Sequence, residues 1–202
     1  MRRVWIQRIS LCLILIPILL GHPAVAATPQ DSEITKSENI NTPKINTKQR
    51  TAVASYMKNE AKGLKNRGYM VETMRNDEVI VVTIPASVLF YPNETYLLES
   101  GKKRLEPLNS YLKTENRFKL IIVTHSDDTG SQEYKNKLTG DRMDAILEYL
   151  QSISNYPEQS FGYAMADTEP RYENDSRENR EKNRRVEIYI VPEEGLIQKL
   201  KK

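Results

Sequence analysis

The residues best suited to chemistry lie in one short stretch, which reads Thr-His-Ser-Asp-Asp-Thr-Gly at positions 124–130. It follows the apolar run 119–124, where β-branched and aliphatic residues stand together ahead of a turn signal. That pattern predicts a buried strand. Polar groups therefore gather where the strand ends, and the carboxylate of Asp127 is among them.

A helix is predicted to follow this turn, capped either by Thr129, with Gln132 three residues on, or by Ser131. Arg142 lies on the same face of that helix as an apolar stripe. A guanidinium in such a stripe is costly to desolvate unless an anion meets it, so we expect a carboxylate partner, internal or from a ligand. Asp127 is the nearest candidate in the sequence. The other residues on this face are Tyr134, Leu138, Ala145, Ile146 and Tyr149.

Three motifs together resemble the OmpA C-terminal family of periplasmic peptidoglycan-binding domains. That family carries a Gly-His-Thr-Asp-x-x-Gly turn, a Tyr-Asn-x-x-Leu-Ser-x-x-Arg-Ala helix and a late Asn-Arg-Arg-Val-Glu strand. Here residues 124–130 match the turn, residues 134–143 (Tyr-Lys-Asn-Lys-Leu-Thr-Gly-Asp-Arg-Met) match the helix, and residues 183–187 are Asn-Arg-Arg-Val-Glu. The motifs occur in the right order, the first two with the right spacing. The resemblance covers about residues 79–191.

The resemblance implies a ligand, the peptide stem of peptidoglycan. Its diaminopimelate carries an ammonium and a carboxylate on the same free end. By position, the carboxylate of Asp127 pairs with the ammonium, and the planar fork of Arg142 takes the carboxylate in two parallel bonds. Thr129, Gly130 and Ser131 would add backbone donors at a helix start, where partial positive charge also favours an anion.

The late motif implies further contacts and a non-enzymatic role. Asn183 and Arg184 resemble the family's motif and are expected to line the pocket, whereas Arg185 is equally compatible with an exposed strand position. The domain would act without catalysis and without a cofactor, with peptidoglycan and envelope proteins as partners.

Three other hypotheses stay open. Asp127 and Arg142 could simply pair with each other as a structural bridge. His125 beside Ser126 could suggest a hydrolase, but neighbours in a turn point apart and no nucleophile elbow or metal motif accompanies them, so we expect His125 to be packed. The third is an envelope scaffold that keeps the fold and binds protein partners instead of the wall.

Five positions depart from the family's pattern. Thr124 stands in place of glycine, Lys135 in place of asparagine and Met143 in place of alanine, and Ala164 and Asn179 replace further glycines. None of these is a member of the Asp-Arg pair. We expect them to affect pocket shape and affinity more than the mode of binding.

The start of the chain is typical of a secretory signal peptide, predicted at residues 1–26. Its basic, apolar and small-x-small parts are Arg2, Arg3 and Arg8, then Ile9 to Leu20, then Ala24-Val-Ala26. An uncleaved inner-membrane anchor is the alternative, because the apolar run approaches a span's length if it extends to Ala27. Leu11 before Cys12 argues against a lipoprotein acylation site. We therefore expect a periplasmic protein, with outer-membrane association also compatible.

Charge and composition narrow the function further. The chain has 30 basic and 27 acidic residues. The signal holds three of the basic ones, so the remainder is balanced (30 − 3 = 27). This balance speaks against nucleic acid as a partner. Beyond the signal there is no cysteine and His125 is the single histidine, so neither a disulfide nor a His/Cys metal cluster is predicted.

The chain past the signal divides into four parts. Residues 27–46 are polar and rich in Ser, Thr and Asn, which predicts a flexible tether. Residues 47–67 carry apolar positions at helical spacing ahead of Gly68, which predicts one amphipathic helix. The OmpA-like domain is assigned to 68–192, and 193–202 are left as a C-terminal tail.

Within the domain, a hairpin is predicted from 69–75 and 78–84 around the turn signal Asn76-Asp77. The apolar residues 79–82 predict a strand covered on both faces. Residues 88–93 resemble the family's strand-to-loop element. A helix over 96–113 follows, in which Gly101 and Pro107 are awkward and predict a kink. Its expected inward residues are Leu98, Leu105, Leu108, Tyr111 and Leu112.

The second half of the domain completes the predicted order. Residues 160–166 are predicted as a strand, and the charged run 167–182 as a solvated loop or short surface helix. The last strand, 185–191, alternates, with Val186, Ile188 and Ile190 on one face. The order indicates an α+β fold, a two-layer sandwich in which helices pack on one face of a mixed sheet.

Overall fold

The computed structural model describes residues 45–201 of the chain. The predicted signal peptide at 1–26, including Cys12, and residues 27–44 of the predicted tether lie outside the described residues. Over 45–201, no helix combines the length and the apolar character that crossing a membrane requires.

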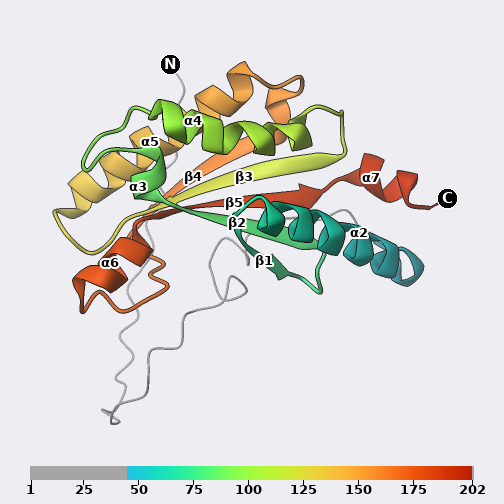
Figure 1. The fold of residues 1–202 in the computed structure, drawn as a ribbon, viewed down its shortest axis with the longest axis horizontal. Helices are drawn as coiled ribbons and strands as arrows, with labels where there is room; N and C mark the ends of the chain where they lie inside the picture. The colour runs from blue at the N-terminus through green and yellow to red at the C-terminus, as the bar shows by residue number, and fades with distance from the viewer. Residues whose placement is uncertain (1–44, 202) are drawn as a thin grey trace, which may run out of the picture.

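The centre of the fold is one mixed sheet of five strands (Figure 1). The strands lie in the order β1-β2-β5-β3-β4, and all neighbours are antiparallel except β3 and β4, which run parallel. The last strand is therefore inserted between β2 and β3. The strands are β1 (Met70–Met74), β2 (Val79–Pro85), β3 (Phe118–His125), β4 (Ser160–Ala166) and β5 (Arg185–Pro192).

Helices cover one face of this sheet, and Figure 1 shows α4 and α5 on the same side of it. Side chains of α2, η3 and α5 share one core with the inward residues of β2, β3 and β5. The predicted α+β two-layer architecture is confirmed. The helical segments are α2 (Thr47–Asn66), α3 (Ala86–Leu89), α4 (Glu99–Leu105), η3 (Glu106–Leu112), α5 (Gln132–Ser152), η4 (Pro157–Gln159), α6 (Arg177–Asn183) and α7 (Glu194–Lys199), where η marks a 3-10 helix.

The three inner strands are buried on both faces. Val79 to Val82 are fully buried, as the apolar run predicts. In β5, Val186, Ile188 and Ile190 face the main core, and Tyr189 and Val191 face a second, smaller cluster. Burying one such aliphatic side chain contributes about 1.5–3 kcal/mol, so these strands provide much of the fold's stability.

The helix α2 has the predicted place and ends one residue before the predicted end. Asn46 caps it and forms a capping box with Gln49, each side chain bonding the other's backbone N–H. Val53 and Met57 are fully buried against the sheet. The helix therefore belongs to the same core as the domain that follows it.

The predicted hairpin is present as β1 and β2. The connection is longer than the predicted two-residue turn, because β1 ends at Met74 and β2 begins at Val79. Within it, Arg75, Asn76 and Asp77 all have left-handed backbone angles, with φ of 53°, 55° and 67°. The side chain of Asp77 accepts a hydrogen bond of 2.6 Å from the Thr73 hydroxyl, which closes the turn locally.

The helix predicted over 96–113 begins later and breaks. The helix α4 starts at Glu99, and the chain changes to the 3-10 helix η3 at Glu106, because Pro107 lacks the N–H that an α-helix would use. Leu98 is only half-buried and caps α4. Gly101 has a packing role, since a Cβ there would lie 3.0 Å from the Leu89 backbone.

Two further segments differ from expectation. Residues 86–89, at the predicted strand-to-loop element, form the single helical turn α3. The expected tail at 193–202 contains the helix α7, whose Leu196 and Ile197 are buried in the main core. The amide of Gly195 donates to the carbonyl of Asn116 at 2.7 Å, which ties α7 to the segment before β3.

Candidate functional site

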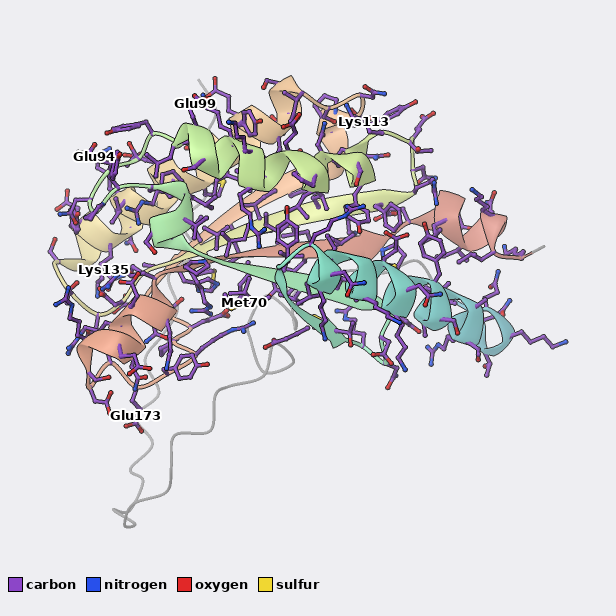
Figure 2. All side chains as sticks on the ribbon, in the orientation of Figure 1. Met70, Glu94, Glu99, Lys113, Lys135 and Glu173 are labelled. Carbon is purple, nitrogen blue, oxygen red and sulfur yellow. The ribbon has the colours of Figure 1, made fainter. Side chains whose placement is uncertain are left out.

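A cavity of about 340 Å³ opens where β3 ends, between the loop after α3, the first turns of α5 and the helix α6. In Figure 2, the labelled residues Glu94, in the loop after α3, and Lys135, on α5, lie at the same end of the molecule. Four basic and two acidic side chains line the cavity: Lys135, Arg142, Arg177 and Arg184, with Asp127 and Glu181. Its formal charge is therefore positive.

Asp127 lies in the wall of this cavity and is buried, with 3% of its surface exposed. Its Oδ1 accepts hydrogen bonds from the Thr129 backbone N–H at 3.0 Å and from the Thr129 hydroxyl at 2.5 Å. Its Oδ2 pairs with a guanidinium nitrogen of Arg184. Burial acts to raise the pKa of Asp127, but the hydrogen bonds from Thr129 and the pairing with Arg184 outweigh it and hold the pKa below its usual value. The residue is ionised at neutral pH.

Arg142 is also in the cavity wall, on the inward face of α5, and is 7% exposed. Its Nε donates to the carbonyl oxygen of Glu94 at 2.8 Å, and its Nη2 donates to that of Tyr91 at 3.1 Å. Its guanidinium also lies 4.9 Å from the ring centre of Phe90. Burial lowers the pKa of Arg142 from its ordinary value, although an arginine stays charged at neutral pH.

The carboxylate predicted for Arg142 is not Asp127. Across residues 45–201, no ion pair joins these two side chains, and Arg184 takes the position next to the carboxylate instead. The structural-bridge hypothesis is therefore wrong. Arg142 bonds only neutral backbone carbonyls within the described chain, so its positive charge is left for something else in the cavity.

The late motif splits between two environments. Arg184 lines the cavity as predicted, pairing with Asp127 and with Glu181. Asn183 does not line it, because it is fully buried and its Oδ1 accepts from the backbone N–H groups of Arg171 and Tyr172. The prediction for Asn183 is corrected: its amide holds the loop before α6.

The turn before α5 is built largely to hold Asp127. Thr129 uses both its backbone N–H and its hydroxyl on that carboxylate. Gly130 has a φ of +93°, which favours glycine, and Ser131 caps the helix by accepting from the Tyr134 N–H at 3.2 Å. Of the two predicted caps, Ser131 is therefore the one used.

A second ionic cluster, which sequence reasoning missed, lies buried beside the site. Glu187 accepts from Arg185 Nε at 2.7 Å, pairs with Arg171 Nε at 2.8 Å and accepts from the Tyr189 hydroxyl at 2.6 Å. The sequence left Arg185 open between the pocket and an exposed strand position; it is 4% exposed and does not line the cavity, so neither position is found. Burial acts to raise the pKa of Glu187, but the neighbouring cations, Arg185 first, lower it to about 2.

His125 borders this buried cluster and is 3% exposed. Its Nε2 lies 3.9 Å from Glu187 Oε2, and neither ring nitrogen has a hydrogen-bond partner in the part of the chain that the structure describes. Burial, and then the charge of Arg185, lower its pKa to about 3, so the ring is neutral at pH 7. This is the packed histidine that the sequence predicts.

The same geometry bears on the hydrolase hypothesis. The Ser126 hydroxyl donates to the carbonyl of Asp127 at 2.9 Å and not to His125, so the nucleophile-to-base hydrogen bond is missing. Residues 45–201 also contain no group of three or more His, Cys, Asp and Glu residues placed to hold a metal ion.

The departures from the family pattern are accommodated by local contacts. The Thr124 hydroxyl donates to the carbonyl of Thr139 on α5 at 2.8 Å. Lys135 is buried in the cavity wall and pairs with Asp167 at 2.5 Å. Met143 packs onto Gly162, where a Cβ would lie 2.0 Å from its sulfur.

The charged run 167–182 is more than a solvated loop. Arg171 reaches the buried Glu187 and also donates to Glu72 at 3.3 Å, and the helix α6 occupies 177–183. Arg177 and Glu181 of α6 reach the cavity, as do Tyr91 and Tyr134. Tyr134, predicted to share the apolar face of α5 with Arg142, is 42% exposed, so that placement is wrong. The buried residues of α5 are Lys135, Thr139, Arg142, Ile146 and Leu150.

Comparison with known proteins shows which family and which proteins this chain is similar to. Residues 89–184 match the OmpA family. A curated relative is the Escherichia coli (strain K12) protein named "Probable lipoprotein YiaD", 24% identical over 128 residues. The match covers 63% of this chain and 58% of that protein, so the chain spans less than two thirds of the relative's length.

Two solved structures are similar in fold. A MotB-like protein from Desulfovibrio vulgaris has 20% identity and a TM-score of 0.62, covering 71% of this chain and 96% of that one. The cell wall anchor of the T6SS from Pseudomonas aeruginosa has 26% identity and a TM-score of 0.55, covering 66% of this chain and 94% of that one.

Proposed function

Because residues 89–184 form an OmpA-family domain, we propose that this protein is a non-catalytic anchor that binds peptidoglycan and ties an envelope protein or complex to the cell wall. The proposed ligand is the free end of diaminopimelate in the peptide stem. Asp127 accepts from its ammonium, and Arg142 donates to its carboxylate. Thr129, Gly130 and Arg184 complete the contacts. The relative from Pseudomonas aeruginosa that is described as a cell wall anchor supports the anchoring role.

One observation carries the proposal: Arg142 is a buried cation that faces a cavity and bonds only backbone carbonyls within residues 45–201. A buried charge without a counter-ion costs several kcal/mol, so the position favours an anion that arrives from outside. A carboxylate bonded by two guanidinium N–H groups meets that need, because such bonds are short and charge-assisted. The fixed bonds to Tyr91 and Glu94 orient the fork before the ligand binds.

Asp127 provides the opposite charge at the same cavity. Its ionised state is secured by Thr129, and its second oxygen is shared with Arg184, whose side chain is 34% exposed. An ammonium group would take over part of this interaction. The zwitterionic end of diaminopimelate then finds one partner of each sign, which is more specific than either charge alone.

The expected setting is the periplasm. The predicted signal peptide would export the chain, and the predicted tether at 27–46 would give the domain reach between its attachment point and the wall. Association with the outer membrane, or retention at the inner membrane by an uncleaved signal, fits the same role.

The test is co-sedimentation of the purified domain with intact peptidoglycan sacculi. We expect the wild type to pellet and the variants Asp127→Asn and Arg142→Ala to stay in solution, while circular dichroism shows all three folded. Lys137→Ala is the matched control, since Lys137 pairs with Asp141 on the exposed side of the same helix. If the folded wild type fails to pellet, peptidoglycan is not the ligand, and the hypothesis of a scaffold that binds protein partners replaces the anchor.

A competition experiment tests the chemistry of the ligand. A stem tripeptide that ends in diaminopimelate should release the domain from sacculi, and the same tripeptide with lysine in its place should not, because the lysine side chain has the ammonium without the second carboxylate. Equal release by the two peptides would contradict the role given to Arg142.

A further inference from the structure

Aromatic side chains line part of the cavity's mouth, or rim, and the contacts proposed for the peptide stem do not use them. Large apolar side chains that are exposed within residues 45–201 are few, and two of them, Tyr91 at 57% and Tyr134 at 42%, line the mouth of this cavity. Tyr96, 57% exposed, lies in the same loop as Tyr91. Exposed aromatic rings that border a binding cavity are typical of ligand contacts, because tyrosine offers an apolar face and a polar tip.

The rim is held in place before any ligand binds. The Tyr134 hydroxyl donates to Asn93 Oδ1 at 3.0 Å, which joins the start of α5 to the loop after α3. On its other side the ring packs against Gly130, where a Cβ would lie 3.0 Å from Tyr134 Cδ1. The carbonyl of Tyr91 accepts from Arg142, so the residue proposed to bind the stem also fixes the loop that carries this ring. A preorganised surface loses little conformational entropy on binding.

The chemistry of the rim differs from that of the cavity wall. The wall carries Asp127, Arg142 and Arg184, whereas Tyr91, Pro92, Asn93 and Tyr134 at the rim are uncharged. A pyranose ring suits such a surface, since its C–H face stacks on an aromatic ring and its hydroxyl and acetamido groups bond to amide and phenol groups. In peptidoglycan, diaminopimelate is the third residue of the stem, so roughly 10 Å of extended chain separates its backbone from the sugar, and its side chain extends further.

We propose that Tyr91 and Tyr134 form a subsite for an N-acetylhexosamine ring of the glycan strand, beside the cavity for the stem. This inference rests on the proposed function, because it takes the stem to occupy the cavity. It makes the ligand a disaccharide with its peptide rather than the peptide end alone.

The test compares two soluble ligands by isothermal titration calorimetry: the free stem tripeptide, and the same tripeptide on its N-acetylglucosaminyl-N-acetylmuramyl disaccharide. We expect the wild type to bind the sugar-bearing ligand roughly two- to tenfold more tightly, the range of one aromatic contact. In Tyr91→Ala and Tyr134→Ala the ratio of the two affinities should fall to about one.

Matched variants separate the ring from its surroundings. Tyr134→Phe keeps the ring and loses the bond to Asn93, so it should keep most of the ratio even if Tyr134→Ala disturbs the turn. Phe161→Ala removes a ring that is 45% exposed on β4, away from this cavity, and should leave the ratio unchanged.

The negative results of this experiment distinguish a failure of the sugar subsite from a failure of the proposed function. Equal wild-type affinities for both ligands, or alanine variants that keep the wild-type ratio, overturn the sugar subsite and leave the stem site standing. If the wild type binds neither ligand, the proposed function itself fails and the subsite fails with it.

Discussion

Two ionic clusters lie near the end of β3 and the start of β5, and they differ in whether every arginine has a carboxylate partner. Around Glu187, a carboxylate is surrounded by Arg185, Arg171 and Tyr189 and is 2% exposed. Around the cavity, Asp127 is paired with Arg184, but the only hydrogen bonds of Arg142 within the described chain go to carbonyl oxygens, and no carboxylate pairs with it there. The buried arginines look alike by exposure, at 4% for Arg185 and 7% for Arg142.

The contrast shows that burial alone does not separate a structural arginine from a binding one. What separates them is whether the protein already provides the counter-ion. Arg184 and Arg185 are consecutive and enter different clusters, because successive residues at the start of a strand point to opposite faces. One side chain therefore serves the cavity, and its neighbour serves the core.

The largest expected effect comes from breaking the buried cluster. Glu187→Gln keeps the shape of the side chain but leaves Arg185 buried without its counter-ion, which should lower the free energy of unfolding by about 3–5 kcal/mol. Urea denaturation followed by circular dichroism measures this. Glu178→Gln, which breaks an exposed pair with Lys182 on α6, is the control and should change nothing measurable. Equal stability of Glu187→Gln and wild type would make the cluster incidental.

The next largest effect concerns Arg142, the buried arginine of the cavity. Arg142→Lys keeps the charge but loses the two-pronged fork, and should weaken binding to a diaminopimelate-containing peptide roughly ten- to hundredfold. The free energy of unfolding should fall by much less than in Glu187→Gln. Calorimetric titration and urea denaturation of the same samples measure both. If Arg142→Lys unfolds as readily as Glu187→Gln, then Arg142 has a structural role like that of Arg185.

Acid should act on the buried cluster through His125. Its pKa is about 3 in the folded protein and about 6.5 in the unfolded chain, so below pH 6.5 the unfolded state binds one more proton. Stability should therefore be full above pH 6.5 and fall by up to about 1.4 kcal/mol per pH unit as the pH drops toward 3.

The variant His125→Asn isolates this contribution. It should show a flatter profile between pH 6.5 and about 4.5. Below that range, Glu187, whose pKa is lowered to about 2, adds its own loss of stability, because the unfolded chain protonates it near its ordinary pKa of about 4.5. Urea midpoints measured across this pH range for both proteins provide the check; parallel curves would contradict it.

The smallest effect concerns the support of Asp127. Thr129→Val removes the hydroxyl that bonds Asp127 Oδ1 and leaves the backbone N–H in place. One hydrogen bond contributes about 1 kcal/mol, so affinity for the peptide should fall roughly fivefold. The pKa of Asp127 should rise, so that binding declines at a higher pH than in the wild type. Titrations at several pH values test this, with Thr129→Ser expected to stay close to wild type.

Much of the secondary structure could be predicted because it depends on local periodicity. The alternation in 185–191 placed Val186 and Ile188 on the core face. The 3.6-residue spacing after Ser131 placed Arg142 on the buried face of α5. Pro107 predicted the disruption of its helix, although not the change to a 3-10 helix. The helix α7 was missed because a single turn or two shows too few apolar positions to form a pattern.

The site was only partly predictable. Asp127, Arg142 and Arg184 do reach one cavity, but Asn183 serves the loop before α6 and Arg185 serves the core. The residues that sequence reasoning missed, such as Tyr91 and Glu181, come from a loop and a short helix without a periodic signal. Tyr134 was placed correctly on its helix and wrongly on the buried face, where the neighbouring Lys135 of the same turn lies instead.

By itself the sequence determined the five strands and the two long helices, because periods of 2 and 3.6 arise from the backbone alone. Only the tertiary structure decided which charges pair. Arg184 reaches Asp127 across 57 residues because β5 is inserted beside β3. Ion pairs form only when packing brings the atoms within about 4 Å, and no local pattern records that distance.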